Sequence, residues 1–141
     1  MLANSRLVIV NTNLSWNRGS WRDMLVNIKA SAYEDRKECV CIIQPGSPIA
    51  LYHVGVEVVV FGSTTGTYRR KTYKGVPDAE YYVPCEFESV VNPLSEPKKA
   101  VSAKQINAFL GAGYHFRQTA FTMPEEAVNY VRETLTRKCE G

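Results

Sequence analysis

The chain has 141 residues, of which 45 % are hydrophobic and 22 % charged, and its formal net charge is +3. This length suits one domain, residues 1–141, that buries roughly two thirds of the surface its unfolded form would expose. No apolar run approaches the roughly 20 residues of a membrane span, so we expect a soluble protein with no membrane partner.

Cysteine and histidine spacing argues against a metal site. The four cysteines include no C-x-x-C pair, and His53 and His115 do not stand at metal-ligand spacing. Cys39 and Cys41 would share one face if their segment were extended, a pattern more typical of packing than of a ligand set. We therefore predict reduced structural thiols, no zinc and no cofactor. The N-terminus lacks the basic and apolar segments of a secretory signal, which favours a cytoplasmic protein.

The predicted elements begin with a strand at residues 7–10, which leads into a loop rich in amides and aromatic rings. Asn11, Asn13 and Trp16 lie in this loop and Trp21 follows it; the chain has no other tryptophan. Amides and flat rings together supply the hydrogen-bonding groups and stacking surfaces that hold a nucleobase. The alternative is that both indole rings pack in the core beneath a helix.

A helix is predicted over residues 21–32. Ser20 is a typical N-cap residue, and Asp23 stands in the first turn. The apolar positions at helical spacing are Trp21, Met24, Leu25, Ile28 and Ala32. Trp21 then lies in the first turn, where its ring and that of Trp16 could face one pocket.

Residues 33–38 are charged and predicted to be exposed, and residues 44–48 are predicted to form a turn. Two dense strand signals follow at residues 49–54 and 56–61, and they indicate buried strands of a curled sheet. A glycine between them marks a bulge or a tight bend. His53 is either a partly buried residue bonded to a carbonyl group or a polar group at the rim of a pocket, where it reads a base edge.

A basic run follows a glycine-containing turn at residues 62–66. It consists of Arg69, Arg70, Lys71 and Lys74, interleaved with Tyr68 and Tyr73. On an exposed hairpin or loop, such cations contact phosphates beside rings that can stack. The alternative is a solvated loop with incidental charge. The turn lacks the Gly-Lys-Ser/Thr end of a phosphate-binding loop.

Residues 81–91 alternate between apolar and polar side chains, which predicts a strand with one wet face. Glu86 and Glu88 lie on that wet face, so we expect no catalysis from them. Pro84 indicates a position near a sheet edge.

Ser102 and Gln105 form a capping box for a short helix that stops at Gly111. Residues 114–121 are predicted as the last strand, and a final helix starts near Pro124. Its buried stripe is Ala127, Val128, Val131 and Leu135. This order lacks regular βαβ alternation and predicts a small α+β domain on a strongly curved, barrel-like, mainly antiparallel sheet.

Residues 46–62, with the pair Tyr52-His53, resemble the core motif of EVE domains. EVE domains belong to the PUA-like superfamily and are close in fold to YTH readers of methylated adenine. Further matching segments are residues 8–11, 21–25, 116–118 and 122–127, so the resemblance covers nearly the whole chain. The chain departs from the family at Ser47-Pro48, where an aspartate is frequent, and at Val56-Glu57, where a second glycine is common.

The resemblance implies a curved sheet flanked by helices, with a pocket that receives a flipped, modified base between aromatic rings. The matching pocket residues are Asn11, Asn13, Trp16, Trp21, Tyr52 and His53. Tyr114, Phe116 and Arg117 are further candidates for lining the cavity. Contacts with the nucleic-acid backbone are assigned to Arg69, Arg70, Lys71, Lys74 and Arg117.

Such domains are similar to the N-terminal specificity modules of McrB-type and HNH-linked modification-dependent restriction systems. We therefore expect a non-catalytic domain that recognises a methylated or hydroxymethylated base in double-stranded DNA, at the nucleoid of a prokaryotic cytoplasm. The implied partner, besides DNA, is a fused or associated nuclease or NTPase. Three alternatives stay open: an RNA-binding reader, an enzyme acting on a base or small molecule in the same pocket, and a protein-interaction module. The chain lacks the recognisable zinc-and-glutamate pattern of a deaminase, which disfavours that kind of enzyme.

Overall fold

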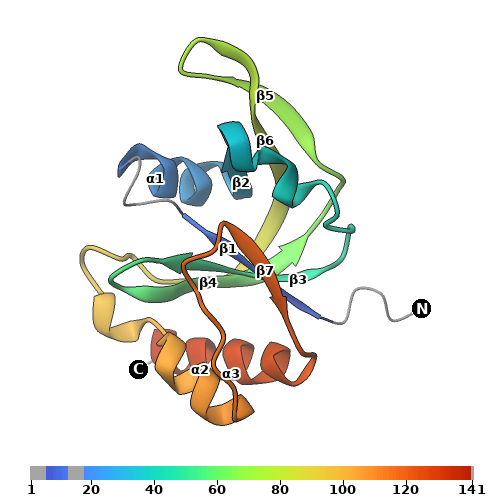
Figure 1. Ribbon diagram of the computed structural model, residues 1–141. Helices are drawn as coiled ribbons and strands as arrows, with labels where there is room; N and C mark the ends of the chain where they lie inside the picture. The colour runs from blue at the N-terminus through green and yellow to red at the C-terminus, as the bar shows by residue number, and fades with distance from the viewer. Residues whose placement is uncertain (1–5, 13–17, 141) are drawn as a thin grey trace.

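The computed structural model describes residues 6–12 and 18–140. Within these ranges, seven strands form a mixed sheet that curls into a half-barrel, and helices flank it (Figure 1). The strands are β1 (Leu7–Asn11), β2 (Lys29–Tyr33), β3 (Pro48–His53), β4 (Glu57–Thr64), β5 (Arg69–Tyr73), β6 (Val76–Val90) and β7 (Ala120–Met123). The helices are α1 (Arg18–Asn27), α2 (Ala103–Leu110) and α3 (Glu126–Glu140), with 3-10 turns η1 (Glu34–Val40) and η2 (Pro97–Lys99). The predicted α+β class with a curved, mainly antiparallel sheet is confirmed.

The sheet has the strand order β2-β6-β4-β3-β1-β7, and β5 pairs with β6. Strands β1 and β3 run parallel, whereas the other pairings between the named strands are antiparallel. Because β1 and β3 are parallel and in register from Val8 and Ile49 onward, both strands end at the same edge of the sheet. This pairing places Asn11 beside Tyr52.

Strand β6 connects the two halves of the sheet. Its residues from Cys85 onward pair with β4, and its earlier residues pair with β2 on one side and β5 on the other. The prediction that Pro84 marks an edge strand is wrong, because Pro84 lies opposite Lys29 inside the sheet. It is tolerated where one ladder ends and the next begins, and its carbonyl oxygen accepts a hydrogen bond from the Thr65 amide at 2.8 Å.

The apolar core lies between the sheet and the C-terminal helices. Strands β1, β3 and β4 are buried along almost their whole length, which explains their continuous apolar runs. Val131 and Leu135 of α3 are fully buried against this core. Helices α2 and α3 lie side by side below the β3–β4 part of the sheet, whereas α1 and η1 lie above it, beside β2 and β6 (Figure 1). None of the described helices is long and apolar enough to cross a membrane.

The predicted helix over residues 21–32 is wrong at both ends. Helix α1 begins at Arg18, so Ser20 lies inside it rather than capping it, and it ends at Asn27. Ile28 adopts a positive φ of 53°, and β2 follows at once. Ala30 and Ala32 then pair with Val83 and Tyr81 of β6. Small alternating residues suit a strand buried on both faces, and the helical spacing of Ile28 and Ala32 was coincidental.

Two further segments differ from expectation. Residues 39–41 are not extended. Cys39 and Val40 are the last two residues of η1, and Cys41 follows in a turn. The last strand starts at Ala120 rather than at residue 114. Residues 114–119 form a loop instead, anchored where the Asn107 side chain bonds both the amide and the carbonyl group of Tyr114.

Several local predictions are confirmed. Gly55 has a φ of 88° and lies in a tight turn between β3 and β4. Ser102 and Gln105 make the full capping box of α2, which ends at Gly111 in the left-handed conformation.

Candidate nucleic-acid interface

A polar and aromatic cluster forms where β1 and β3 end. Asn11, Tyr52 and His53 are buried there, with 6 %, 6 % and 1 % of their surface exposed. Thr12 follows β1, and its amide donates a hydrogen bond to the Tyr52 carbonyl oxygen at 2.9 Å. The parallel pairing therefore brings both segments that were assigned to the base pocket into contact.

Thr12 and Trp21 hold the ring of His53 from two sides. The Thr12 hydroxyl lies 2.9 Å from His53 Nδ1. Trp21, from α1, meets the same ring edge-on, with centroids 5.5 Å apart and planes at 84°. Burial lowers the pKa of His53, which favours the neutral imidazole. The polar partner of His53 is thus a hydroxyl group, where the sequence suggested a carbonyl group or an open pocket rim.

Tyr52 extends the cluster toward the loop before β7. Its ring packs against Phe116 at a centroid distance of 5.1 Å, and its hydroxyl donates to Glu57 Oε2 at 3.3 Å. Burial and the negative charge of Glu57 raise the pKa of Tyr52, and the positive charge of Arg117 opposes them. Arg117 therefore lies near the cluster while its own side chain is exposed.

A groove of about 680 Å³ opens at the edge of the half-barrel, between the end of β2 and the start of β7. Tyr33 and Tyr73 lie in its wall together with Arg117 and Thr119. The Thr119 carbonyl oxygen accepts a hydrogen bond from the Asn11 amide at 2.9 Å, so one wall of the groove is joined to the cluster at the ends of β1 and β3, although no residue of that cluster lines the groove. Charges of both signs line it, because Glu34, Asp35 and Arg36 complete the wall on the η1 side.

A buried charged network lies behind Tyr33. Lys29 Nζ contacts Glu80 Oε2 at 2.6 Å and Asp23 Oδ2 at 2.9 Å. Ser31 Oγ donates to the same Glu80 oxygen at 2.8 Å. Lys29 and Glu80 are 3 % and 2 % exposed, so the pair is sealed from solvent. Burial alone would lower the pKa of Lys29, but the hydrogen bonds and charges of Glu80 and Asp23 outweigh it and raise that pKa.

The basic run forms the exposed hairpin of β5 and β6, which turns at Lys74 and Gly75, both with positive φ. Its cations divide between two faces because side chains alternate along a strand. Arg70 lies over the Tyr81 ring at 5.6 Å. Lys71 stands opposite Glu80 instead, and its charge helps to lower the pKa of Asp23.

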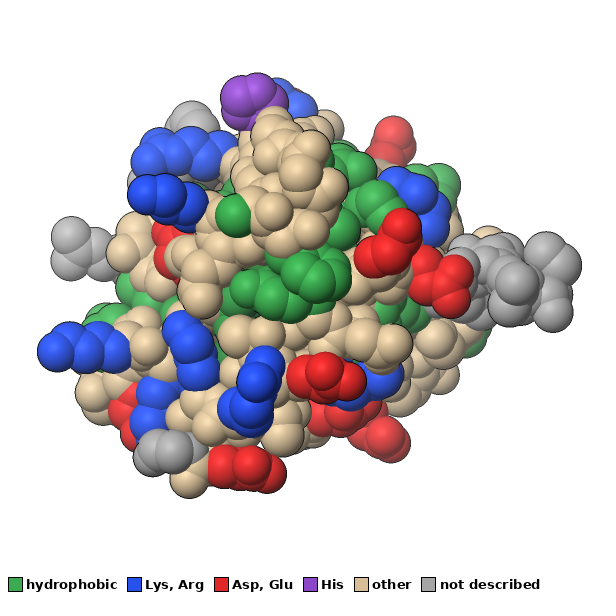
Figure 2. Space-filling view, turned by 90° about the horizontal axis from the view of Figure 1, so that it is seen from below, with side chains coloured by type: hydrophobic (Ala, Val, Ile, Leu, Met, Phe, Trp, Pro, Cys, Tyr) green, Lys and Arg blue, Asp and Glu red, His purple; other side chains and the backbone are tan. Residues whose placement is uncertain are grey.

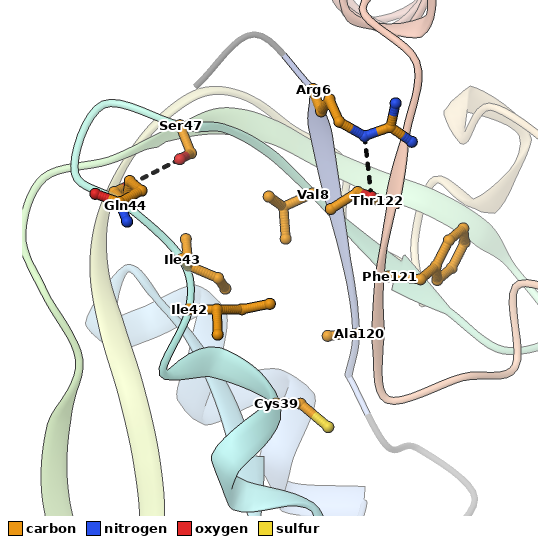
Figure 3. A pocket seen from close by; sticks show the side chains of 10 residues that line it. All are labelled: Arg6, Val8, Cys39, Ile42, Ile43, Gln44, Ser47, Ala120, Phe121 and Thr122. Carbon is orange, nitrogen blue, oxygen red and sulfur yellow. Dashed lines mark hydrogen bonds between the residues drawn. The ribbon is translucent and has the colours of Figure 1, made fainter. Parts of the chain in front are cut away.

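Other surfaces are less suited to a polyanion. A small apolar pocket of about 140 Å³ lies between β1, β7 and the loop after η1, where the exposed Ile42 and the buried Ile43 point toward Val8 (Figure 3). Arg6 at its rim donates to Thr122 Oγ1 at 3.1 Å. On the face formed by α2 and α3, positive and negative side chains surround a central apolar area (Figure 2).

The structure therefore brings together four of the six assigned pocket residues, Asn11, Trp21, Tyr52 and His53. Asn13 and Trp16 lie outside the described residues. Arg117 lies beside this cluster, whereas Arg69, Arg70, Lys71 and Lys74 belong to the separate β5–β6 hairpin.

Sequence reasoning missed Thr12 and Tyr33. Thr12 stands between two assigned asparagines, so its position in the amide-rich loop was an available signal. Tyr33 gave no such signal, because it was grouped with the exposed charged residues that follow it. It is only 7 % exposed in the structure.

The described residues contain no group of three or more histidine, cysteine or acidic side chains placed to hold a metal ion. The four cysteines are free. Burial raises the pKa of Cys85 to about 12, so this thiol is a poor nucleophile.

No family model and no curated protein matches this chain. Several solved structures, in contrast, are similar to it in fold. An RNA complex of the YTH domain-containing protein mmi1 is similar with a TM-score of 0.61 and 6 % identity, covering 92 % of this chain and 80 % of that one. The YTH domain of Zygosaccharomyces rouxii MRB1, in complex with N6-methyladenosine RNA, gives a TM-score of 0.57 and 8 % identity, covering 92 % and 86 %.

A third similar structure is Rpa0253 from Rhodopseudomonas palustris, with a TM-score of 0.57, 13 % identity and 94 % of each chain covered. Identities this low establish a shared fold and leave the ligand open. The half-barrel described above is thus the YTH-like α+β fold, reached by a chain of very different sequence.

Proposed function

We propose that this protein binds a modified base in a nucleic acid and performs no chemistry on it. The observation that carries the proposal is the groove at the open edge of the half-barrel, whose lining residue Thr119 is hydrogen-bonded to Asn11 of the buried cluster. A volume of about 680 Å³ lies within the range of small-molecule sites.

The groove combines the chemical groups that such a ligand needs. Tyr33 and Tyr73 offer aromatic surface, and Arg36 and Arg117 offer cations to phosphates. Unstacking a base costs a few kcal/mol, and stacking on a protein ring returns about 1–3 kcal/mol. Hydrogen bonds from polar residues of the groove wall, such as Gln118 and Thr119, would supply the remainder.

Duplex DNA and RNA are the two candidate polymers. The resemblance to EVE domains favours modified DNA, with the chain as the specificity module of a restriction system that supplies a nuclease or NTPase. RNA is favoured by the mmi1 and MRB1 structures, both described as RNA complexes. We keep the DNA assignment as the first proposal and RNA as the second, and one experiment separates them.

The test is a titration by fluorescence anisotropy at one fixed salt concentration. Duplex DNA with methyladenine, methylcytosine or hydroxymethylcytosine is compared with unmodified duplex, and single-stranded RNA with N6-methyladenosine is compared with unmodified RNA. We expect at least tenfold tighter binding of one modified oligonucleotide than of its unmodified control. Equal affinity for every modified and unmodified pair would refute the reader function.

Variants then test the site. Trp21→Phe keeps an apolar ring in the core but changes the contact with the His53 ring, so it should reduce discrimination between modified and unmodified base. Arg117→Ala should weaken all oligonucleotides alike, because a phosphate contact carries no base information. Phe109→Leu is the control, since this half-exposed ring stacks on Tyr130 of α3, on the helical side of the sheet. Unchanged discrimination in Trp21→Phe would exclude that ring from the pocket.

A further inference from the structure

Strand β7 lies at one edge of the sheet and pairs with β1 alone among the described strands. The Asn11 amide donates to the Thr119 carbonyl oxygen, so these two residues form a hydrogen-bonded pair of the antiparallel ladder. Hydrogen-bonded and non-hydrogen-bonded pairs alternate along such a ladder, so Phe121 also bonds to β1. Ala120 and Thr122 belong to the non-hydrogen-bonded pairs. Their amide and carbonyl groups therefore point away from β1, toward the open edge.

No described segment takes up these backbone groups. Within residues 6–12 and 18–140, no backbone hydrogen bond joins Ala120 or Thr122 to another part of the chain. Thr122 is exposed and Ala120 is partly exposed. Two amides and two carbonyl groups are thus aligned at strand spacing, which makes this edge a template for another extended chain.

The apolar pocket between β1, β7 and the loop after η1 lies on the face of β7 that carries the side chains of Ala120 and Thr122 (Figure 3). Alternate side chains of a strand added to β7 project on this same face. The pocket has a volume of about 140 Å³, and its wall includes Ile43 and Ile42, the latter 78 % exposed. Because an apolar cavity of about 150 Å³ binds benzene, this pocket is large enough for one branched or aromatic side chain.

A cation stands at each end of the β7 edge. Arg6 lines the pocket and donates to Thr122 Oγ1, and the described residues of the pocket wall include no acidic side chain. Arg117 is exposed, three residues before Ala120. Glu125, which follows β7, lines a different pocket beside β4, and the acidic residues of η1 line the groove. This distribution favours a ligand with acidic residues on both sides of its apolar residue.

We propose that the edge of β7 binds an extended segment of a partner protein. The segment adds a strand to the sheet, places one branched or aromatic side chain in the pocket and carries an acidic residue on each side of it. Backbone hydrogen bonds then supply affinity, and the pocket supplies specificity. The inference does not depend on the proposed function, because it concerns a protein partner and is tested without nucleic acid.

The probes are fluorescein-labelled, capped nonapeptides of alternating threonine and valine, with a glutamate at each end and phenylalanine, leucine or aspartate at the centre. Fluorescence anisotropy measures their binding to the full chain. We expect the phenylalanine or leucine peptide to bind at least about tenfold more tightly than the aspartate peptide, because a carboxylate is costly to bury in an apolar pocket. Absence of binding by all three peptides, or equal binding, would overturn the proposal.

N-methylation of the peptide tests the backbone contacts. Successive amides of an extended chain point to opposite sides, so methylation of one alternate set should abolish binding and methylation of the other set should preserve it. Binding that survives methylation of either set would show that the peptide does not add a strand.

Variants of the protein test the edge and the pocket separately. Thr122→Pro removes an outward amide at an edge position, where proline is tolerated, and should weaken peptide binding at least about tenfold. Ile42→Asp places a carboxylate at the pocket and should also weaken binding at least about tenfold. Leu94→Asp is the matched control, since Leu94 is 68 % exposed and does not line the pocket. If Thr122→Pro does not fold, the comparison of Ile42→Asp with Leu94→Asp still decides, and equal affinities of these two would refute the pocket assignment.

Amide hydrogen exchange reads the edge directly. In the free protein the amides of Ala120 and Thr122 should exchange at least about tenfold faster than that of Phe121, and the bound peptide should slow both. Slow exchange of both amides in the free monomer would show that the edge is already paired, against the proposal. A concentration-dependent dimer that protects the two amides would assign the edge to a second copy of this chain and would overturn the peptide partner.

Discussion

Removing Lys29 should destabilise this fold more than removing Glu80, although the two form one ion pair. The Lys29 and Glu80 side chains are 4 % and 3 % exposed, whereas Asp23, the second partner of Lys29, is 32 % exposed. In Lys29→Met, Glu80 stays as a buried carboxylate that keeps the hydrogen bond from the Ser31 hydroxyl but has lost its counter-charge. In Glu80→Gln, Lys29 still has Asp23 at 2.9 Å.

The magnitudes follow from what each change leaves buried. A buried charge that loses its counter-charge costs about 3–5 kcal/mol, which we expect for Lys29→Met. Glu80→Gln retains a side-chain oxygen near Ser31 and should cost about 1–2 kcal/mol. The double variant Lys29→Met/Glu80→Leu leaves no buried charge in this pair, so it should be more stable than Lys29→Met alone. Domains of this size are stable by about 5–15 kcal/mol, so these differences are measurable.

Urea unfolding followed by tryptophan fluorescence measures them, provided that the slope of free energy against denaturant is unchanged among the variants. Equal losses for Lys29→Met and Glu80→Gln, or a double variant no more stable than Lys29→Met, would refute the argument.

The pH dependence gives an independent check. The pKa of Lys29 is raised, so its contribution is present below the unfolded pKa near 10.5 and is lost as pH rises through the folded value. The pKa of Asp23 is lowered, chiefly because hydrogen bonds and the charge of Lys29 outweigh the opposing effect of burial, so its contribution is present above about 3.8 and is lost on acidification. Lys29→Met should therefore flatten the part of the acid limb that comes from Asp23.

Three further predictions concern single positions. Burial lowers the pKa of His53 below 6.5, so the unfolded chain binds the proton at a higher pH than the folded protein does. The free energy of unfolding should therefore fall as the pH drops below about 6.5, and His53→Gln should remove this pH dependence. A pH dependence that persists in the variant would exclude His53 as its source. Gly62→Ala should lower the free energy of unfolding by about 1–3 kcal/mol, because a Cβ at this position meets the Glu86 carbonyl oxygen. Gly113→Ala is the control, since the space around it is open, and it should be neutral or slightly stabilising. Equal effects of the two substitutions on urea unfolding would contradict the packing argument. If Lys71 contacts phosphate, Lys71→Ala should reduce the slope of log affinity against log salt by about 0.9, and Arg70→Ala should leave it nearly unchanged because Arg70 packs on Tyr81. The reverse order would show that the face of the hairpin that carries Arg70 binds instead.

The sequence predicted well where the physical cause is local. Gly55 between two β-branched runs and the pair Ser102–Gln105 each act within a few residues, and both behave as expected. It failed where burial overrides local preference. The spacing of Ile28 and Ala32 favours a helix only weakly, and the pairing of Ala32 with Tyr81 in the complete sheet outweighs that local preference.

The sequence by itself determined the class of fold, because periodic apolar strands, turn glycines and helix caps are all written in neighbouring residues. Part of the buried cluster at the ends of β1 and β3 was visible too, since Asn11 stands in the amide-rich loop and Tyr52-His53 in the EVE-like segment. Only the tertiary structure decided their arrangement. Thr12 meets His53 across 41 residues because β1 and β3 pair in parallel, and Tyr33 lines a groove because β2 and β7 face each other across the open edge. Contacts of this kind depend on strand pairing over long separations, which local patterns do not encode.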